Sequence, residues 1–137
     1  MTHLRPAIAL SAATVAVLLV GCGGSKNNVL APQFQPEVVN AIDNFQFQVT
    51  GVTGVTQVIV YSWRNTGVQA NVDQSCSITS GSATISVRDS TGALLHARNL
   101  ADNGSFATTP GLAGTWTVRI DLSGVRGNLN FRLQKKT

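Results

Sequence analysis

Thr115–Leu133 reads TWTVRIDLSGVRGNLNFRL, and apolar residues occupy every second position in each half of this stretch. The first half has Trp116, Val118, Ile120 and Leu122, and the second half, after Ser123-Gly124, has Leu129, Phe131 and Leu133. Alternation with a period of two is typical of a half-buried β-strand, because successive side chains point to opposite faces. The stretch therefore predicts a C-terminal β-hairpin with one apolar and one polar face.

The same alternation extends upstream to Asp43. It predicts further strands over 45–49, 57–64, 68–78, 83–87 and 93–98, with a short one around Phe106. Gln74 is the one polar residue at an inward position of the third strand, and a bulge over 73–75 would turn it outward. Turn residues such as Asp89-Ser90-Thr91-Gly92 separate the strands. We therefore expect an all-β fold: an antiparallel, jelly-roll-like β-sandwich of about eight short strands.

The N-terminus has the pattern of an export signal. Arg5 precedes an apolar run over 7–20, which leads into Leu19-Val20-Gly21-Cys22. This run is shorter than the roughly 20 residues that a spanning helix needs. Leu19-Val20-Gly21-Cys22 resembles the lipobox of bacterial lipoproteins, which implies a diacylglyceryl group on the Cys22 sulfur and cleavage just before Cys22. An ordinary secretory peptide with a chance cysteine and a frayed N-terminal helix are the alternatives.

These features predict three parts of the chain. Residues 1–21 form a lipoprotein signal peptide, residues 22–41 a flexible tether and residues 42–137 a β-sandwich domain. The tether is predicted from a small polar run over 23–28, followed by Pro32 and Pro36. The alternative is a first strand that packs back on the domain around Phe34.

A second resemblance concerns the end of the chain. Gly114-Thr115-Trp116-Thr117-Val118-Arg119-Ile120, followed by Gly124, Gly127, Leu129, Phe131 and Leu133, is similar to the closing hairpin of jelly-roll domains appended to secreted proteases. These include P domains and the prepeptidase C-terminal type. The resemblance implies a jelly-roll fold and, with a separate partner, an accessory role beside a hydrolase.

Charge and cysteine content argue against a nucleic-acid-binding protein and against a disulfide within the chain. The formal net charge is +4, but the arginines are scattered along the chain, whereas nucleic-acid binders cluster their basic residues. We therefore expect no nucleic-acid partner. Lipid on Cys22 leaves Cys76 without a disulfide partner in the chain.

Residues that could carry chemistry are few. His96 and Cys76 could form a nucleophilic dyad, but Cys76 is at an inward position, where a buried thiol is inert. Asp89 and Asp102 lie in turn sequences, where carboxylates bind nearby backbone N–H groups; a loop-end Ca²⁺ site is the alternative. In the predicted mature chain, which starts at Cys22, the one histidine, His96, and the one free thiol, Cys76, cannot close a zinc site. We expect no catalytic residue, no cofactor and no metal site.

The large aromatic residues allow two interpretations. Tyr61, Trp63 and Trp116 could form a sugar-stacking platform, but they share the parity of core residues such as Ile59 and Val118. We predict that they belong to the core. The outward positions carry Thr, Ser, Asn, Gln and Arg, which suits a hydrated sheet and a polar ligand.

Taken together, the sequence predicts a lipid-anchored cell-envelope binding or structural module without catalytic activity. Its expected partners are the membrane, through lipid on Cys22, and an envelope protein or a polysaccharide. Its expected location is the outer membrane, or the outer face of the cell membrane in an organism with only one. The alternatives are an accessory domain of a secreted hydrolase, a small envelope hydrolase, and a lipid carrier with a cavity between its sheets.

Overall fold

The protein is described by a computed structural model, which covers residues 34–137. The strands are β1 (Glu37–Ala41), β2 (Asn44–Asn65), β3 (Ala70–Gln74), β4 (Ser77–Arg88), β5 (Leu94–Asn99), β6 (Gly104–Ala107) and β7 (Gly114–Lys135). All pairings among them are antiparallel, and no helix occurs in this part of the chain. The predicted all-β class is confirmed.

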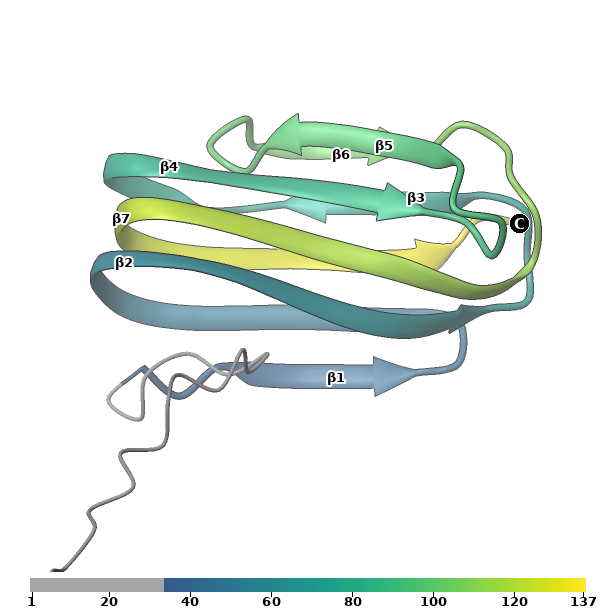
Figure 1. The fold of residues 1–137 in the computed structure, drawn as a ribbon, viewed down its shortest axis with the longest axis horizontal. Helices are drawn as coiled ribbons and strands as arrows, with labels where there is room; N and C mark the ends of the chain where they lie inside the picture. The colour runs from purple at the N-terminus through teal and green to yellow at the C-terminus, as the bar shows by residue number, and fades with distance from the viewer. Residues whose placement is uncertain (1–33) are drawn as a thin grey trace, which may run out of the picture.

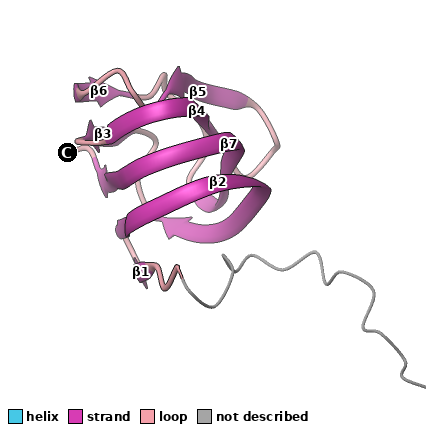
Figure 2. Cartoon of the chain, turned by 90° about the vertical axis from the view of Figure 1, so that its left-hand side faces the viewer, coloured by secondary structure: helices cyan, strands magenta, loops and turns pink. Residues whose placement is uncertain are grey.

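The strands form one sheet that folds over on itself into two layers (Figures 1 and 2). The first layer contains β1, the first half of β2, the second half of β7, β3 and β6. The second layer contains the second half of β2, the first half of β7, most of β4, and β5. The result is an antiparallel β-sandwich whose layers are continuous at one end, on the left of Figure 1.

The predictions of separate strands over 45–49 and 57–64, and of a hairpin at 123–124, are wrong. β2 and β7 are continuous 22-residue strands that bend where the turns were expected. Their mutual register shifts three times between Val49 and Gln57, and β4 shifts against β7 between Ile78 and Ser82. Such bulges bend a strand without ending it. The bends stack in three neighbouring strands, so all three pass together from one layer to the other.

Gly81 shows why glycine occurs in these bends. Its φ is +72°, in the left-handed region, and a Cβ at this position would lie 2.3 Å from the carbonyl oxygen of Gly124. A side chain here would therefore meet both an unfavourable backbone conformation and the backbone of β7.

The core lies between the layers. In the first layer, the Phe131 ring stacks against Phe45 and Phe47, with centroids 6.0 and 5.3 Å apart. In the second, Trp63 and Trp116 meet edge to face at 5.8 Å. All five side chains are buried. Burial of a large aromatic side chain contributes about 1.5–3 kcal/mol of transfer free energy, so this cluster is a major stabilising feature.

Three further predictions need correction. Glu37–Ala41, assigned to the tether, forms β1 and pairs with β2. The strand predicted over 68–78 is divided: Val68 lies in a loop and is 52% exposed, and the chain leaves the ladder between Gln74 and Ser77. Gln74 is not turned outward by a bulge but is buried. The strand predicted over 93–98 and the one around Phe106 are confirmed as β5 and β6.

Candidate functional site

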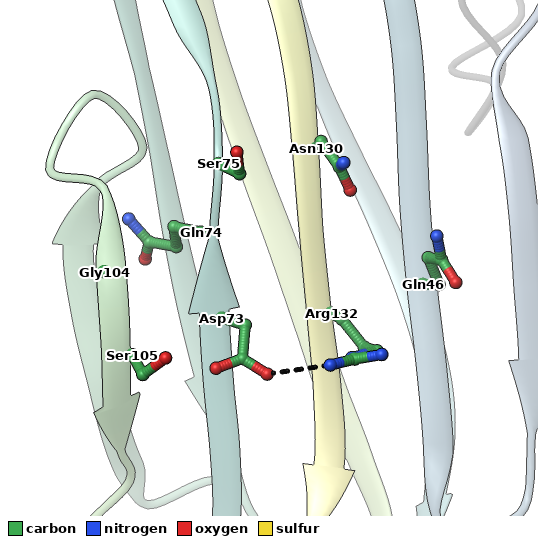
Figure 3. Close-up of a pocket in the computed structure, with 8 residues that line it drawn as sticks. All are labelled: Gln46, Asp73, Gln74, Ser75, Gly104, Ser105, Asn130 and Arg132. Carbon is green, nitrogen blue, oxygen red and sulfur yellow. Dashed lines mark hydrogen bonds and ion pairs between the residues drawn. The ribbon is translucent and has the colours of Figure 1, made fainter.

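A groove of about 370 Å³ crosses β2, β7, β3 and β6 on the outer face of the first layer (Figure 3). Every lining residue is polar, charged or glycine: Gln46, Asp73, Gln74, Ser75, Gly104, Ser105, Asn130 and Arg132. The apolar neighbours of these residues face the core, and the alternation along each strand brings polar side chains outward. The period-two pattern thus accounts for the outward side chains of the groove, such as Gln46, Asp73 and Arg132, but not for Gln74, which has inward parity.

The strand register aligns four of these side chains in a row. Gln46 lies opposite Arg132 on the neighbouring strand, Arg132 opposite Asp73, and Asp73 opposite Ser105. Neighbouring strands are about 4.8 Å apart, so the row extends over about 14 Å from β2 to β6. One elongated ligand could contact all four.

Asp73 and Arg132 form the charged centre of this row. The guanidinium Nη2 lies 3.3 Å from the Asp73 Oδ2, with the side chains 34% and 47% exposed. At this exposure an ion pair contributes at most about 1 kcal/mol to stability. The pair leaves further guanidinium N–H donors of Arg132 available to a ligand, because the contact with Asp73 uses only one nitrogen.

The side-chain amides of Gln46 and Asn130, beside this ion pair, form no hydrogen bonds within the described part of the chain. Each offers both N–H donors and a carbonyl acceptor. In Figure 3 both side chains lie above the Arg132 guanidinium. A ligand in the groove therefore meets donors and acceptors together.

Gln74 is an unusual member of the lining because it is only 3% exposed. Its Nε2 donates to the carbonyl oxygens of Asn99 and Asp102, at 3.1 and 2.9 Å. These two bonds fix the orientation of the amide, and Oε1 is left buried with no hydrogen-bond partner. A buried acceptor without a partner costs free energy, and so this oxygen calls for a donor that the described residues do not supply.

Cys76 lies close to the groove but is not equipped for catalysis by its surroundings. It is buried, as its inward parity predicted. Its Sγ contacts the backbone oxygen and nitrogen of Asn130 at 3.4 and 3.3 Å. Burial raises the pKa of the thiol, which keeps it protonated at neutral pH.

His96 has a different environment. Its ring is tilted against Phe106, with centroids 6.2 Å apart, and the Arg98 guanidinium lies 3.9 Å from the centre of the same Phe106 ring. Its Nε2 is buried without a hydrogen-bond partner. Burial and the nearby Arg98 charge lower the pKa of His96. The His96 side chain is thus half-buried between β5 and β6.

The candidate acids have structural partners. Asp89 accepts hydrogen bonds from the Thr91 N–H and hydroxyl and from the N–H groups of Ala93 and Leu112. These bonds, the Thr91 hydroxyl first, lower its pKa to about 2. Its predicted turn role is confirmed. Asp102 lies 3.7 Å from Arg98 in an exposed ion pair. Within residues 34–137, no three His, Cys, Asp or Glu side chains are grouped so as to hold a metal ion.

The tryptophans belong to the core, as predicted. Trp63 Nε1 donates to the Ala41 carbonyl at 2.9 Å, and Trp116 Nε1 donates to the Leu112 carbonyl at 2.7 Å. Tyr61 is partly buried against Phe45, with centroids 5.2 Å apart. None of the three lines the groove, so a ligand there would be held by hydrogen bonds rather than by ring stacking.

The sequence pointed to some of these groove residues but not to their arrangement. The outward parity of Gln46, Asn130 and Arg132 was visible in the alternation. The pairing of Arg132 with Asp73, 59 positions away, and the buried amide of Gln74 were not. Both depend on which strands become neighbours.

The fold and groove define a small antiparallel β-sandwich with a polar outer face. No protein-family model and no curated protein matches the chain. No helix within residues 34–137 is long and apolar enough to cross a membrane. The predicted signal peptide and the predicted lipidation site, Cys22, lie outside the described residues.

Proposed function

We propose that this chain is a lipid-anchored, exported module of the cell envelope that binds a partner through the groove on its first layer and has no catalytic activity. The lipobox resemblance at Leu19-Val20-Gly21-Cys22 supports the anchor. The groove supports the binding role, because Gln46 and Asn130 offer unpaired polar groups beside Arg132 on a surface that the fold does not otherwise use.

The character of the groove favours binding over catalysis. General acid–base and nucleophilic catalysis need a titratable or nucleophilic group within reach of the substrate. Among the lining residues, Asp73 is the one carboxylate, none is a histidine or a cysteine, and Asp73 is already paired with Arg132. Neither Cys76 nor His96 lines the groove.

The anchor is tested by a Cys22→Ser variant of the full chain. Cells fed radiolabelled palmitate should label the wild-type protein, and the variant should stay unlabelled and accumulate as a precursor or in the soluble fraction. Continued labelling of the variant would contradict the anchor.

The binding role is tested with a matched pair of variants. Asp73→Asn/Arg132→Gln removes the charged centre of the groove. Arg119→Gln/Asp121→Asn removes an exposed ion pair of 2.9 Å on the outer face of the second layer. Affinity capture from detergent-solubilised envelopes should recover a specific partner with the wild type and the second variant but not with the first. Absence of any specific partner, protein or glycan, would refute the binding role.

A further inference from the structure

We infer that the groove takes a neutral saccharide, held by hydroxyl groups that donate to some lining residues and accept from others. This inference rests on the proposed function and narrows its ligand to one chemical class. It depends on three properties of the groove. The backbone groups of its strands are already paired with one another, its charges balance, and its side chains offer both unpaired donors and unpaired acceptors.

The backbone of the groove favours a ligand other than an extended peptide. Proteins commonly bind extended peptides by adding them as a strand to a free sheet edge, so that backbone hydrogen bonds supply the affinity. In the groove, β2 pairs with β7, β7 with β3, and β3 with β6, and no strand edge lies between them. Recognition there must come from side chains.

The charge of the groove favours a neutral ligand. Its lining contains one cation, Arg132, and one anion, Asp73, 3.3 Å apart. An anionic ligand would gain from Arg132 but would be repelled by Asp73 at almost the same place, and a cationic ligand would meet the reverse. A neutral ligand avoids both penalties.

The unpaired groups favour hydroxyls. The Asp73 carboxylate and the Gln74 Oε1 can only accept hydrogen bonds, whereas the Arg132 guanidinium can only donate them. A hydroxyl group does both. A saccharide carries several hydroxyls on adjacent carbons, so it can donate hydrogen bonds to one lining group and accept them from its neighbour. The groove, at about 370 Å³, is near the lower end of the usual range for small-molecule sites.

Gln74 is the most specific element of this inference. It lies opposite Gly104, which has no side chain, and the Phe106 ring lies 3.3 Å from the place where a Gly104 Cβ would be (Figure 3). The amide cannot turn over without giving up its two bonds to Asn99 and Asp102. Because Oε1 is buried, a hydroxyl that supplies its missing donor must move the Phe106 ring aside as it enters beside Gly104. A permanently bound water is the competing occupant, and it predicts that added saccharide leaves the Gln74 amide undisturbed.

The test is NMR of the ¹⁵N-labelled chain over residues 22–137 with Cys22→Ser, which retains every described residue. The probes are neutral cello-oligosaccharides and N-acetylglucosamine oligosaccharides, anionic oligogalacturonides and cationic chitosan oligosaccharides. A neutral probe should shift the side-chain NH₂ signals of Gln46, Gln74 and Asn130 in a saturable way. The NH₂ signal of Asn65, at the end of β2 and outside the groove lining, should not move.

The two paired variants complete the test. Asp73→Asn/Arg132→Gln should raise the dissociation constant for the neutral probe by about tenfold or more, because charged hydrogen-bond partners are lost. Arg119→Gln/Asp121→Asn should leave it unchanged. Shifts caused only by a charged probe, an undisturbed Gln74 signal, or no response to any probe would overturn the saccharide assignment. An envelope protein captured through Arg132 would also overturn it while leaving the proposed function intact.

Discussion

The stacked bends make a quantitative prediction about two glycines. Gly54 in β2 and Gly81 in β4 have nearly the same left-handed backbone, with φ of +65° and +72°. They differ in what a Cβ would meet. At Gly54 nothing lies within 4 Å, whereas at Gly81 the Gly124 and Ser123 carbonyl oxygens would be 2.3 and 2.6 Å away. Substitution by alanine therefore separates backbone strain from steric conflict.

The expected costs follow from these contacts. Gly54→Ala should cost about 1–2 kcal/mol, the penalty of a left-handed conformation for an L-residue, partly offset by a less flexible unfolded chain. Gly81→Ala has the same penalty and must also displace the β7 backbone, which adds about 1–3 kcal/mol. With about 4–8 °C of melting temperature per kcal/mol for a domain of this size, Gly81→Ala should melt at least about 5 °C below Gly54→Ala.

The assay is urea unfolding followed by tryptophan fluorescence. Trp63 and Trp116 are both fully buried, so their emission should report loss of the core. The midpoint should fall further for Gly81→Ala than for Gly54→Ala, with the slope m unchanged. If the two variants had the same free energy of unfolding within about 0.5 kcal/mol, β4 and β7 would not pack closely at the bend. The folded-over sheet would then be refuted.

Three other predictions concern individual side chains. Asp89 has a pKa of about 2 in the folded chain against 3.8 when unperturbed, so its stabilising effect should be full above about pH 4 and lost as the pH falls through about 2. Urea midpoints of wild type and Asp89→Asn should accordingly converge between pH 5 and pH 2, and a constant gap would contradict this role. In the Cys22→Ser chain, the Cys76 thiol should react with a disulfide reagent at pH 8 far more slowly when folded than in urea; equal rates would show that it is accessible. Asn103→Ala should lower stability by about 1–3 kcal/mol because two backbone groups of Cys76 lose their partner, and hydrogen exchange should rise first in β6. Exchange that rises first elsewhere would count against this link.

Local sequence signals predicted the elements that depend on neighbouring residues. β5, β6 and the turn at Asp89 were predicted where they occur, because strand parity and Asp-Ser-Thr-Gly turn chemistry act over a few residues. The buried positions of Trp63 and Trp116 followed from the same alternation. These local patterns were sufficient to predict the all-β class.

The bends could not be predicted in this way. A glycine at position 54 or 124 is compatible with a tight hairpin, in which the chain returns beside itself, and with a bulge, in which it crosses to another layer. The choice depends on the neighbouring strands. β2 bends because β7 bends at the same level, and the two remain paired on both sides of the bend, from Val49 with Leu129 to Gln57 with Leu122.

The groove depends on a second non-local feature, the interruption between β3 and β4. Where the chain leaves the ladder, the Asn103 side chain takes the place of a strand: its Oδ1 accepts from the Cys76 N–H at 2.7 Å and its Nδ2 donates to the Cys76 carbonyl at 2.8 Å. Asn103 directly precedes β6, so these two bonds fix Gly104 and Ser105 at the rim of the groove. The same loop supplies the Asp102 carbonyl that orients the Gln74 amide. A break that looks like a defect in the sheet therefore holds both the rim and the buried acceptor of the candidate site.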